Sequence, residues 1–246
     1  MAQSTGETSP LGLRTYSEAF DACGIPDEMR TPEHFFIDYG PDGQAYPIPT
    51  EIGPFNSSIG VYRLQRNGAL FAPQAEVHEQ AQVGPRTFIG NAAIISAGVV
   101  IAEGCDIGDF TKIGDDTTIA ANTFIDNKSE IGPNSEVGRD VDIGEGTTVY
   151  GYTKLFQRTR IGHGVVIGSS AVIGPDNDIE DKVMIDSKTV THGKVVIRAG
   201  ANIGVSATIG FGSEILGQTK VGTQRRIRPN TIVIPNKFRR ARKDDQ

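Results

Sequence analysis

The chain has 246 residues, a formal net charge of −6 at pH 7 and two cysteines. It lacks an apolar run of about 18 residues, and its start, MAQSTGETSP, lacks the basic and apolar regions of a secretory signal. These features argue against a membrane span and against a disulfide framework. We therefore expect a cytoplasmic, disulfide-free protein with no membrane partner.

The N-terminal part of the chain follows no repeat. Residues 1–12 are polar and rich in Gly, Pro and Ser, which is typical of a loosely held segment. Residues 13–30 have the composition of one short helix, and the prolines and glycines of residues 32–54 argue against a long regular element there. Because many apolar side chains remain, we expect residues 1–70 to form an irregular cap on the domain that follows.

An aliphatic residue recurs every six positions across residues 77–233. Of the 27 positions on this step, 26 hold Ile, Val or Leu, and Thr191 is the exception. The position four after each aliphatic residue is usually small or β-branched, with Asn177, Arg225 and Lys237 as departures. Gly, Asn and Asp, which tolerate positive φ, are frequent in between. A period of six fits neither a helix nor a flat strand, so each hexad is predicted to be a short strand followed by a corner.

Strands that turn every six residues, yet keep the same side chains inside, must wind around one core. A parallel β-helix is the architecture that permits this. Three sides of six residues give coils of 18 residues, so about nine coils would form a rod about 43 Å long. The predicted organisation is a cap in residues 1–70, a β-helix in residues 71–236 and a basic tail in residues 237–246.

The repeat resembles that of the hexapeptide-repeat, left-handed β-helix proteins, many of which are acyltransferases. The resemblance covers residues 77–233 and implies an all-β fold, a left-handed parallel β-helix of about nine triangular coils that assembles as a homotrimer. It also implies transfer of an acyl group, most simply acetyl, from acetyl-CoA or another acyl-CoA. The acceptor would be a small molecule with a hydroxyl or amine, such as a sugar or nucleotide sugar, and a histidine would act as general base.

The histidines are the first candidates for this chemistry; they are His34, His78, His163 and His192. No two lie within six residues, so the ligands of the γ-type carbonic anhydrases of this fold are missing, and no metal is expected. Counting by 18 puts the last three on different sides of the coil, so they cannot converge within one chain. His163 stands at a corner where other hexads have Asp, Pro or Glu, and therefore ranks behind His192. These two would meet only across a trimer interface.

His192 follows Thr191, the one break in the aliphatic column. Asn177 lies on the same side one coil earlier, so Asn177 and Thr191 should be diagonal neighbours in the core. In one interpretation they simply hydrogen-bond each other, as buried polar groups must. In the other, the break positions His192, with Lys188 or Lys194, at a substrate groove. Both interpretations remain open.

Outward strand positions near both candidate histidines are apolar: Val166, Val172, Met184, Val190 and Val196. An exposed apolar band usually marks an interface. We therefore expect three rods to pack through this band and to leave clefts between them.

The C-terminal end is strongly basic. Residues 220–246 contain nine basic and two acidic residues, a charge of +7 that leaves −13 on the rest of the chain. Arg225, Arg226 and Arg228 are candidates for holding the phosphates of acyl-CoA, and a solvated tail that prevents stacking of the open end is the alternative. The basic residues form no stripe interleaved with aromatic residues, so no nucleic-acid partner is expected.

A non-enzymatic role is the second hypothesis for function. The six-residue frame never slips across residues 77–233, so there is no room for the extruded loop that often carries the catalytic histidine in such enzymes. A trimeric scaffold or binding module would also use a rigid rod of this kind.

Overall fold

The structure is a computed structural model that describes residues 68–235 throughout and, before them, four short strands at 34–35, 38–39, 45–46 and 62–64. The helix expected in residues 13–30, most of the cap and the tail at 237–246 lie outside the described residues. Within the described residues there are strands and turns, and none of them belongs to a helix able to cross a membrane.

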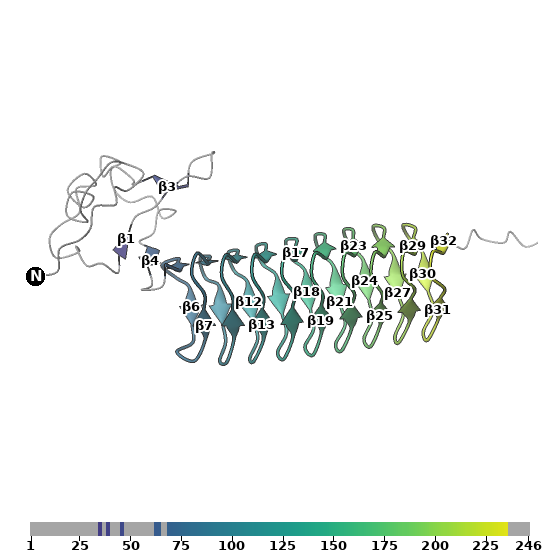
Figure 1. Cartoon of the computed structure of the whole chain (residues 1–246), viewed down its shortest axis with the longest axis horizontal. Helices are drawn as coiled ribbons and strands as arrows, with labels where there is room; N and C mark the ends of the chain where they lie inside the picture. The colour runs from purple at the N-terminus through teal and green to yellow at the C-terminus, as the bar shows by residue number, and fades with distance from the viewer. Residues whose placement is uncertain (1–33, 36–37, 40–44, 47–61, 65–67, 236–246) are drawn as a thin grey trace, which may run out of the picture.

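Each hexad forms a two-residue strand followed by a tight corner, and the strands wind into a long rod (Figure 1). The first strand residue points outward and the second is buried, as in β11 (Asp106–Ile107) and β17 (Asp142–Ile143). This alternation explains the period: two strand residues and a four-residue turn return the chain to the same inward direction. The frame runs without a slip to Val233.

Strands 18 residues apart pair in parallel and build three sheets, which we call the first, second and third faces. The first face contains β5 (Leu70–Phe71), β8 (Phe88–Ile89), β11, β14 (Phe124–Ile125), β17, β20 (Arg160–Ile161), β23 (Asp178–Ile179), β26 (Val196–Ile197), β29 (Glu214–Ile215) and β32 (Ile232–Val233). At its N-terminal end β4 (Tyr62–Leu64) and β1 (His34–Phe35) add in antiparallel fashion. A separate pair consists of β2 (Asp38–Tyr39) and β3 (Ala45–Tyr46).

The other two faces contain nine strands each. The second contains β6 (Glu76–Val77), β9 (Ile94–Ile95), β12 (Lys112–Ile113), β15 (Glu130–Ile131), β18 (Thr148–Val149), β21 (Val166–Ile167), β24 (Met184–Ile185), β27 (Asn202–Ile203) and β30 (Lys220–Val221). The third contains β7 (Gln82–Val83), β10 (Val100–Ile101), β13 (Thr118–Ile119), β16 (Glu136–Val137), β19 (Lys154–Leu155), β22 (Val172–Ile173), β25 (Val190–Thr191), β28 (Thr208–Ile209) and β31 (Arg226–Ile227). The predicted all-β, parallel β-helix of about nine triangular coils is confirmed.

The buried aliphatic residues form one continuous core along the rod. Threonines of the small column bring hydroxyl groups into this core, where each needs a partner. Thr123 Oγ1 donates to the carbonyl of Gly138 at 2.9 Å, and Thr147 Oγ1 donates to that of Gly162 at 2.8 Å. These bonds run from one coil to the next, so they tie the stack together along its axis.

The corners depend on a left-handed backbone. Every sixth residue from Arg86 to Asn230 has a φ between 52° and 69°, including bulky residues such as Phe110 and Tyr152. This conformation costs a non-glycine residue about 1 kcal/mol, and coil stacking offsets the cost: Tyr152, for example, donates its N–H to the Pro133 carbonyl at 2.9 Å. We call the turn after the first face the first corner, that after the second face the second corner and that after the third face the third corner.

Candidate functional site at the third corner

The structure places the three described histidine side chains on three different corners. His78 follows β6 on the second face, His163 follows β20 on the first and His192 follows β25 on the third. The expectation that they do not converge within one chain is confirmed.

His192 stands in an open position on the third corner. Its side chain is exposed and makes no hydrogen bond or ion pair with the described residues. The residues 18 before and after it are Gly174 and Gly210, so neither adjacent coil places a side chain beside the imidazole. Phe156 and Arg228 stand in the same column, two coils away on either side. A ligand can therefore approach the ring along the rod.

An aromatic side chain and an ammonium group lie beside His192. The Nζ of Lys194 is 5.8 Å from the centre of the Phe211 ring. The same ring reaches back over Gly193, where an added Cβ would lie 3.6 Å from its Cδ2 atom. Phe211 is 47% exposed and Phe156 is 42% exposed. The third corner thus offers an imidazole, aromatic surface and a cation within neighbouring coils.

A buried polar pair lies under this corner. Asn177 Nδ2 donates to Thr191 Oγ1 at 2.6 Å, and Asn177 Oδ1 accepts the Val195 N–H at 2.7 Å. Thr191 Oγ1 also accepts the Gly174 N–H at 3.2 Å. The two residues are the diagonal neighbours that the sequence predicted, and they satisfy each other. Because Thr191 directly precedes His192, the pair fixes the backbone that carries the imidazole.

The candidate phosphate-binding arginines lie toward the C-terminal end. Arg226 belongs to β31 on the third face, and Arg228 is two coils from His192, about 10 Å along the axis. Arg225 occupies an inward position but is exposed, because no described coil covers it. None of the three makes an ion pair within residues 68–235. Their role as phosphate ligands stays a prediction.

His163 lies at the first corner, in a groove of about 420 Å³. Prominent lining residues besides His163 are Phe124, Asp142, Arg160, Asp178 and Glu180. His163 Nδ1 accepts the N–H of Glu145 at 3.0 Å. Because that lone pair is engaged, the hydrogen-bond network assigns the proton of the neutral ring to Nε2. Nε2 is then a donor, so His163 in this arrangement is poorly placed to remove a proton.

The first corner also contains a ladder that sequence reasoning missed. The Asn91 N–H donates to Asp109 Oδ1 at 2.7 Å, and the Asp109 N–H donates to Asn127 Oδ1 at 2.7 Å. Farther along, the His163 N–H donates to Asp181 Oδ1 at 2.8 Å. The signal was available, since acceptor side chains recur 18 residues apart at this corner. His163 is one rung of this ladder.

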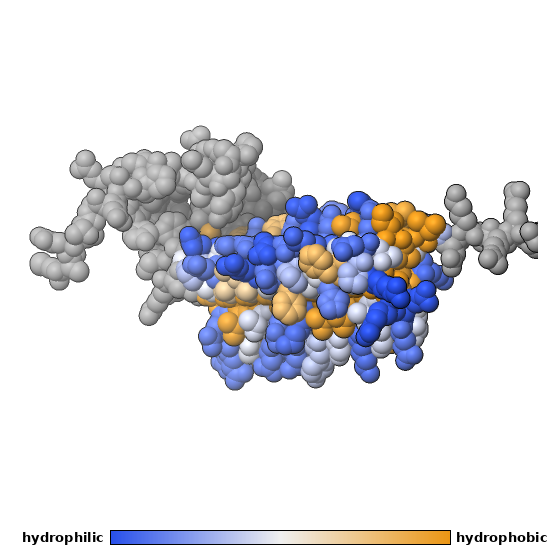
Figure 2. All heavy atoms as spheres, turned by 45° about the vertical axis from the view of Figure 1, so that its right-hand side comes forward, coloured by the Kyte–Doolittle hydropathy of each residue, from blue (hydrophilic) through white to orange (hydrophobic). Residues whose placement is uncertain are grey.

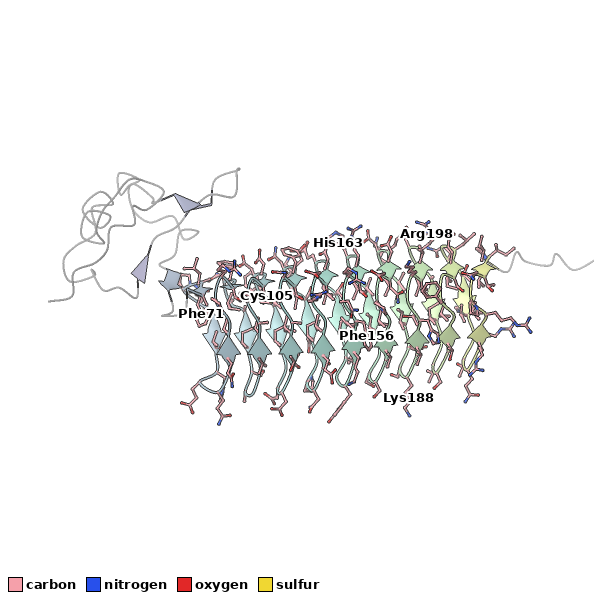
Figure 3. All side chains as sticks on the ribbon, viewed as in Figure 1. Phe71, Cys105, Phe156, His163, Lys188 and Arg198 are labelled. Atoms are coloured by element: carbon pink, nitrogen blue, oxygen red, sulfur yellow. The ribbon has the colours of Figure 1, made fainter. Side chains whose placement is uncertain are left out.

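The groove at the first corner is bounded by an ion-pair cluster. Arg198 pairs with Glu180 at 2.6 Å and with Glu214 at 2.8 Å. The hydrogen bond from Arg198, and the N–H of Ala199, lower the pKa of Glu180 below its usual value. Figure 3 shows His163 and Arg198 along the same edge of the rod. Among the described residues no group of three His, Cys, Asp or Glu side chains is placed to hold a metal ion.

The outward apolar side chains do not form one band. Val166 and Met184 lie on the second face, Val172 and Val190 on the third, and Val196 on the first. They encircle the rod, because residues six apart always fall on successive faces. No single flat contact covers all five, which corrects the expected interface.

Lys188 and Lys194, the two lysines considered together with His192, lie at different corners. Lys188 is on the second corner, at the lower edge of the rod in Figure 3, whereas Lys194 shares the third corner with His192. Only Lys194 is placed to act together with His192 within one chain.

Comparisons with known proteins concern the repeat and the fold. A family model described as "Bacterial transferase hexapeptide (six repeats)" matches residues 116–151. A search of curated protein sequences found no match. Among solved structures, the UDP-N-acetylglucosamine O-acyltransferase of Moraxella catarrhalis is 21% identical, with a TM-score of 0.41, over 63% of this chain and 65% of that chain.

Two further solved structures show a similar fold over smaller parts of this chain. A GDP-perosamine N-acetyltransferase from Caulobacter crescentus, in complex with CoA and GDP-perosamine, is 23% identical, with a TM-score of 0.38, over 48% of this chain and 52% of that one. A UDP-N-acetylglucosamine acyltransferase from Bacteroides fragilis is 19% identical, with a TM-score of 0.40, over 56% and 68%. The chain thus spans 65% and 52% of the first two of these proteins.

The protein is a β-solenoid, and residues 116–151 match the model of the bacterial transferase hexapeptide repeat. The predicted resemblance is confirmed at this level.

Proposed function

We propose that the protein transfers an acyl group from an acyl-CoA to a hydroxyl or amine of a small acceptor, with His192 as general base. The observation that carries the proposal is the open setting of the His192 side chain, between Gly174 and Gly210, with no hydrogen bond from the imidazole to the described residues. A neutral imidazole with an unengaged nitrogen takes up a proton near neutral pH. The ring of His163, in contrast, accepts a hydrogen bond from the backbone N–H of Glu145, which lies at the same corner one coil earlier.

The proposed chemistry needs one proton acceptor and one leaving group. His192 takes the proton from the acceptor hydroxyl or amine as the oxygen or nitrogen attacks the thioester carbonyl. The carbon–sulfur bond then breaks, the acyl group stays on the acceptor, and the imidazolium returns its proton to the CoA thiolate. The reaction requires no oxidant or reductant.

The cosubstrate would lie along the third face toward the C-terminal end. Arg226 and Arg228 supply positive charge without a competing ion pair among the described residues, as a phosphate site requires. The exposed rings of Phe156 and Phe211 offer apolar surface on either side of His192. Arg225, on the end of the rod, is the least well placed of the three candidate arginines for this route.

A homotrimer would complete the proposed site. The outward residues of the third face next to His192 are Val172 and Val190, and both are partly buried within a single chain. A neighbouring rod packed on this side would cover them and would enclose His192 in a cleft. This arrangement follows the resemblance to hexapeptide-repeat enzymes.

A scaffold or binding module is the second candidate function. The observation that favours it is the uninterrupted frame of the described coils, in which no loop leaves the rod. Such a protein would use the same trimer as a rigid spacer and would not bind acyl-CoA.

Binding of acetyl-CoA to the full chain separates these functions. We expect acetyl-CoA to raise the thermal unfolding temperature, since a ligand at 100 times its Kd stabilises the native state by about 2.7 kcal/mol. Arg226→Glu with Arg228→Glu should abolish the shift, whereas Lys112→Glu, on the second face, should not. No shift at millimolar acetyl-CoA would favour the scaffold.

Turnover tests the role of His192. Release of the CoA thiol in the presence of a panel of amino sugars and nucleotide sugars should fall by about 100-fold or more in His192→Ala. His163→Ala is the matched control and should retain activity. An equal loss of activity in His192→Ala and His163→Ala would contradict the assignment of His192 as the general base.

A further inference from the structure

A notch lies at the second corner, in the middle of the rod. It has a volume of about 240 Å³ and spans the coils of β18, β21 and β24. Its principal lining residues are Tyr150, Val166, Ser169, Met184, Asp186 and Ser187. None of them belongs to the His192 site or lines the groove at the first corner. We call this hollow the second-corner notch.

The hexad pattern itself explains the notch. The residue after each buried aliphatic of the second face forms a column along the rod, which from 132 to 204 consists of Gly132, Tyr150, Gly168, Asp186 and Gly204. Because Gly168 has no side chain, a gap remains between the side chains of Tyr150 and Asp186. These two residues are two coils apart, about 10 Å along the axis. The notch therefore needs no loop that leaves the rod.

The floor of the notch is apolar. Val166 and Met184 are register partners in the parallel pairing of β21 with β24. Met184 is 47% exposed and Tyr150 is 54% exposed, so both present apolar surface to a ligand. On the side of the rod shown in Figure 2, apolar side chains lie in small patches between hydrophilic ones. A hollow with an apolar floor and few polar groups is typical of small-molecule sites, and the small volume of this one limits the ligand to a compact molecule.

Asp186 gives the notch a negative charge without a counterion. Among the described residues it is the one charged group that lines the notch. Its side chain is partly buried and makes no hydrogen bond or ion pair with them. Lys188, two residues later, lies at the lower edge of the rod in Figure 3 and makes no ion pair within residues 68–235. Because burial makes an unpaired charge costly, the carboxylate favours a cationic ligand.

Two hydroxyl groups that line the notch have acceptor capacity to spare. Ser169 Oγ and Ser187 Oγ lie 3.4 Å apart on adjacent coils, beyond the ~2.5–3.0 Å that is usual between two hydroxyl groups. Each hydroxyl oxygen has two lone pairs, so each can accept a further hydrogen bond. The notch thus offers three acceptor groups, which are one carboxylate and two hydroxyls.

We propose that the second-corner notch binds a small primary amine in its ammonium form. The three N–H groups of the ammonium donate to the Asp186 carboxylate and to the hydroxyls of Ser169 and Ser187. The carbon skeleton packs on Met184 and on the ring of Tyr150, whose face also attracts a cation. A neutral polyol would leave the carboxylate without a counterion, and a quaternary ammonium has no N–H to donate. The notch is separate from the proposed His192 site and does not depend on it.

The test uses the full chain and cyclohexylmethylamine as the probe, with no acyl donor present. The chain has three methionines, of which Met184 lines the notch, so ¹³C labelling of methionine methyl groups reports the contact by NMR and Met184→Leu assigns its signal. We expect the Met184 signal to shift saturably with the amine. Asp186→Asn should weaken binding by about tenfold or more, because it removes the charge. Asp116→Asn, at the second corner nearer the N-terminal end, is the matched control and should bind the amine as the parent does.

Two analogues of the amine separate charge from hydrogen bonding. Cyclohexylmethanol, which is neutral, and the N,N,N-trimethyl derivative, which lacks N–H groups, should each bind the parent protein about tenfold more weakly than the amine. Absence of a saturable shift, equal affinity for the alcohol, or an unchanged affinity of Asp186→Asn would overturn the proposal. Equal weakening in Asp116→Asn would also overturn it, since the overall charge of the rod would then decide binding. A trimethyl derivative that binds as tightly as the amine would overturn the assignment of a primary amine. The analogue comparison uses the parent protein, so it decides the question even where a variant is unstable, and none of these measurements depends on catalysis by His192.

Discussion

Asn177 Nδ2 donates a hydrogen bond of 2.6 Å to the Oγ1 of Thr191, the one polar residue in the aliphatic column of the core. The bond joins Asn177, the first amide in the column of small residues, to Thr191, which carries the single hydroxyl of the aliphatic column. The presence of each polar residue in the core accounts for the presence of the other. Asn177 without Thr191 would leave its buried NH₂ group without this acceptor. Thr191 without Asn177 would interrupt the stack of aliphatic residues without gaining this hydrogen bond. The pair acts as one polar unit under the third corner.

Thr191→Val should destabilise the protein by about 1–3 kcal/mol, because it leaves Asn177 Nδ2 buried without an acceptor. The Gly174 N–H keeps the Thr191 main-chain carbonyl as a partner at 2.9 Å, so the loss is confined to the amide. Thr191→Val combined with Asn177→Thr should recover most of the stability. Chemical denaturation of the three proteins measures the difference. A single variant as stable as the parent would show that the amide finds another partner.

The neutral imidazole of His163 should carry its proton on Nε2, because Nδ1 accepts the Glu145 N–H at 3.0 Å. The ¹⁵N chemical shifts of the ring distinguish the two tautomers directly. His192, which has no such bond among the described residues, should show a mixture of tautomers. A dominant Nδ1-protonated form of His163 would contradict the geometry and would restore it as a candidate base.

Much of this fold could be predicted because a six-residue period leaves few alternatives. The period placed Ile107, Ile143 and Val233 in the core, and the 18-residue coil placed Asn177 beside Thr191. The same count of 18 also determines the face of each outward side chain, but the expected apolar band followed closeness in sequence and not this count. Val166 and Val172 are close in sequence, yet they lie on different sheets. The role of His163 as a corner acceptor depends on hydrogen bonds between coils, and the recurrence of acceptor side chains 18 residues apart at this corner was the available signal for it.

Cys105 should react slowly with thiol reagents in the native protein. It is 2% exposed, its Sγ–H donates to the Ala120 carbonyl at 3.2 Å, and burial raises the pKa of the thiol above its usual value. In a Cys23→Ser variant we expect labelling about 100-fold slower than for free cysteine, rising to the free rate in denaturant. Fast native labelling would show that the coil opens at this point.

Glu180 should titrate below its ordinary value of 4.5, because it accepts hydrogen bonds from Arg198 and from the Ala199 N–H. A carboxyl whose pKa is lower in the folded state stabilises the fold above its unfolded pKa, and this contribution is lost as the pH falls through the folded pKa. Arg198→Met should therefore raise the pKa of Glu180 and reduce stability at pH 7 more than at pH 3. The effect should be small, since solvent screens this partly exposed pair.

The matched control for that measurement is Arg160→Met. The Nε of Arg160 is 4.0 Å from Asp142 Oδ2, a looser pair, so its removal should change the pH dependence less. NMR titration of the Glu180 carboxyl carbon follows the group itself. An unchanged pKa in Arg198→Met would mean that the Ala199 N–H alone holds the carboxylate.

Gly204 and Gly222 occupy the same column one coil apart, and alanine should act on them in opposite directions. At Gly204 the new methyl group would lie 2.7 Å from the Thr223 nitrogen, so Gly204→Ala should separate two coils and cost about 1–3 kcal/mol. At Gly222 the methyl group meets nothing within 4 Å, and φ is not in the left-handed region. Gly222→Ala should therefore stabilise the isolated chain by about 0.4–1 kcal/mol, because alanine restricts the unfolded state. Thermal and denaturant unfolding of both variants gives the comparison. If Gly222→Ala were as destabilising as Gly204→Ala, the added methyl group at Gly222 would meet another part of the chain, against the open space found there.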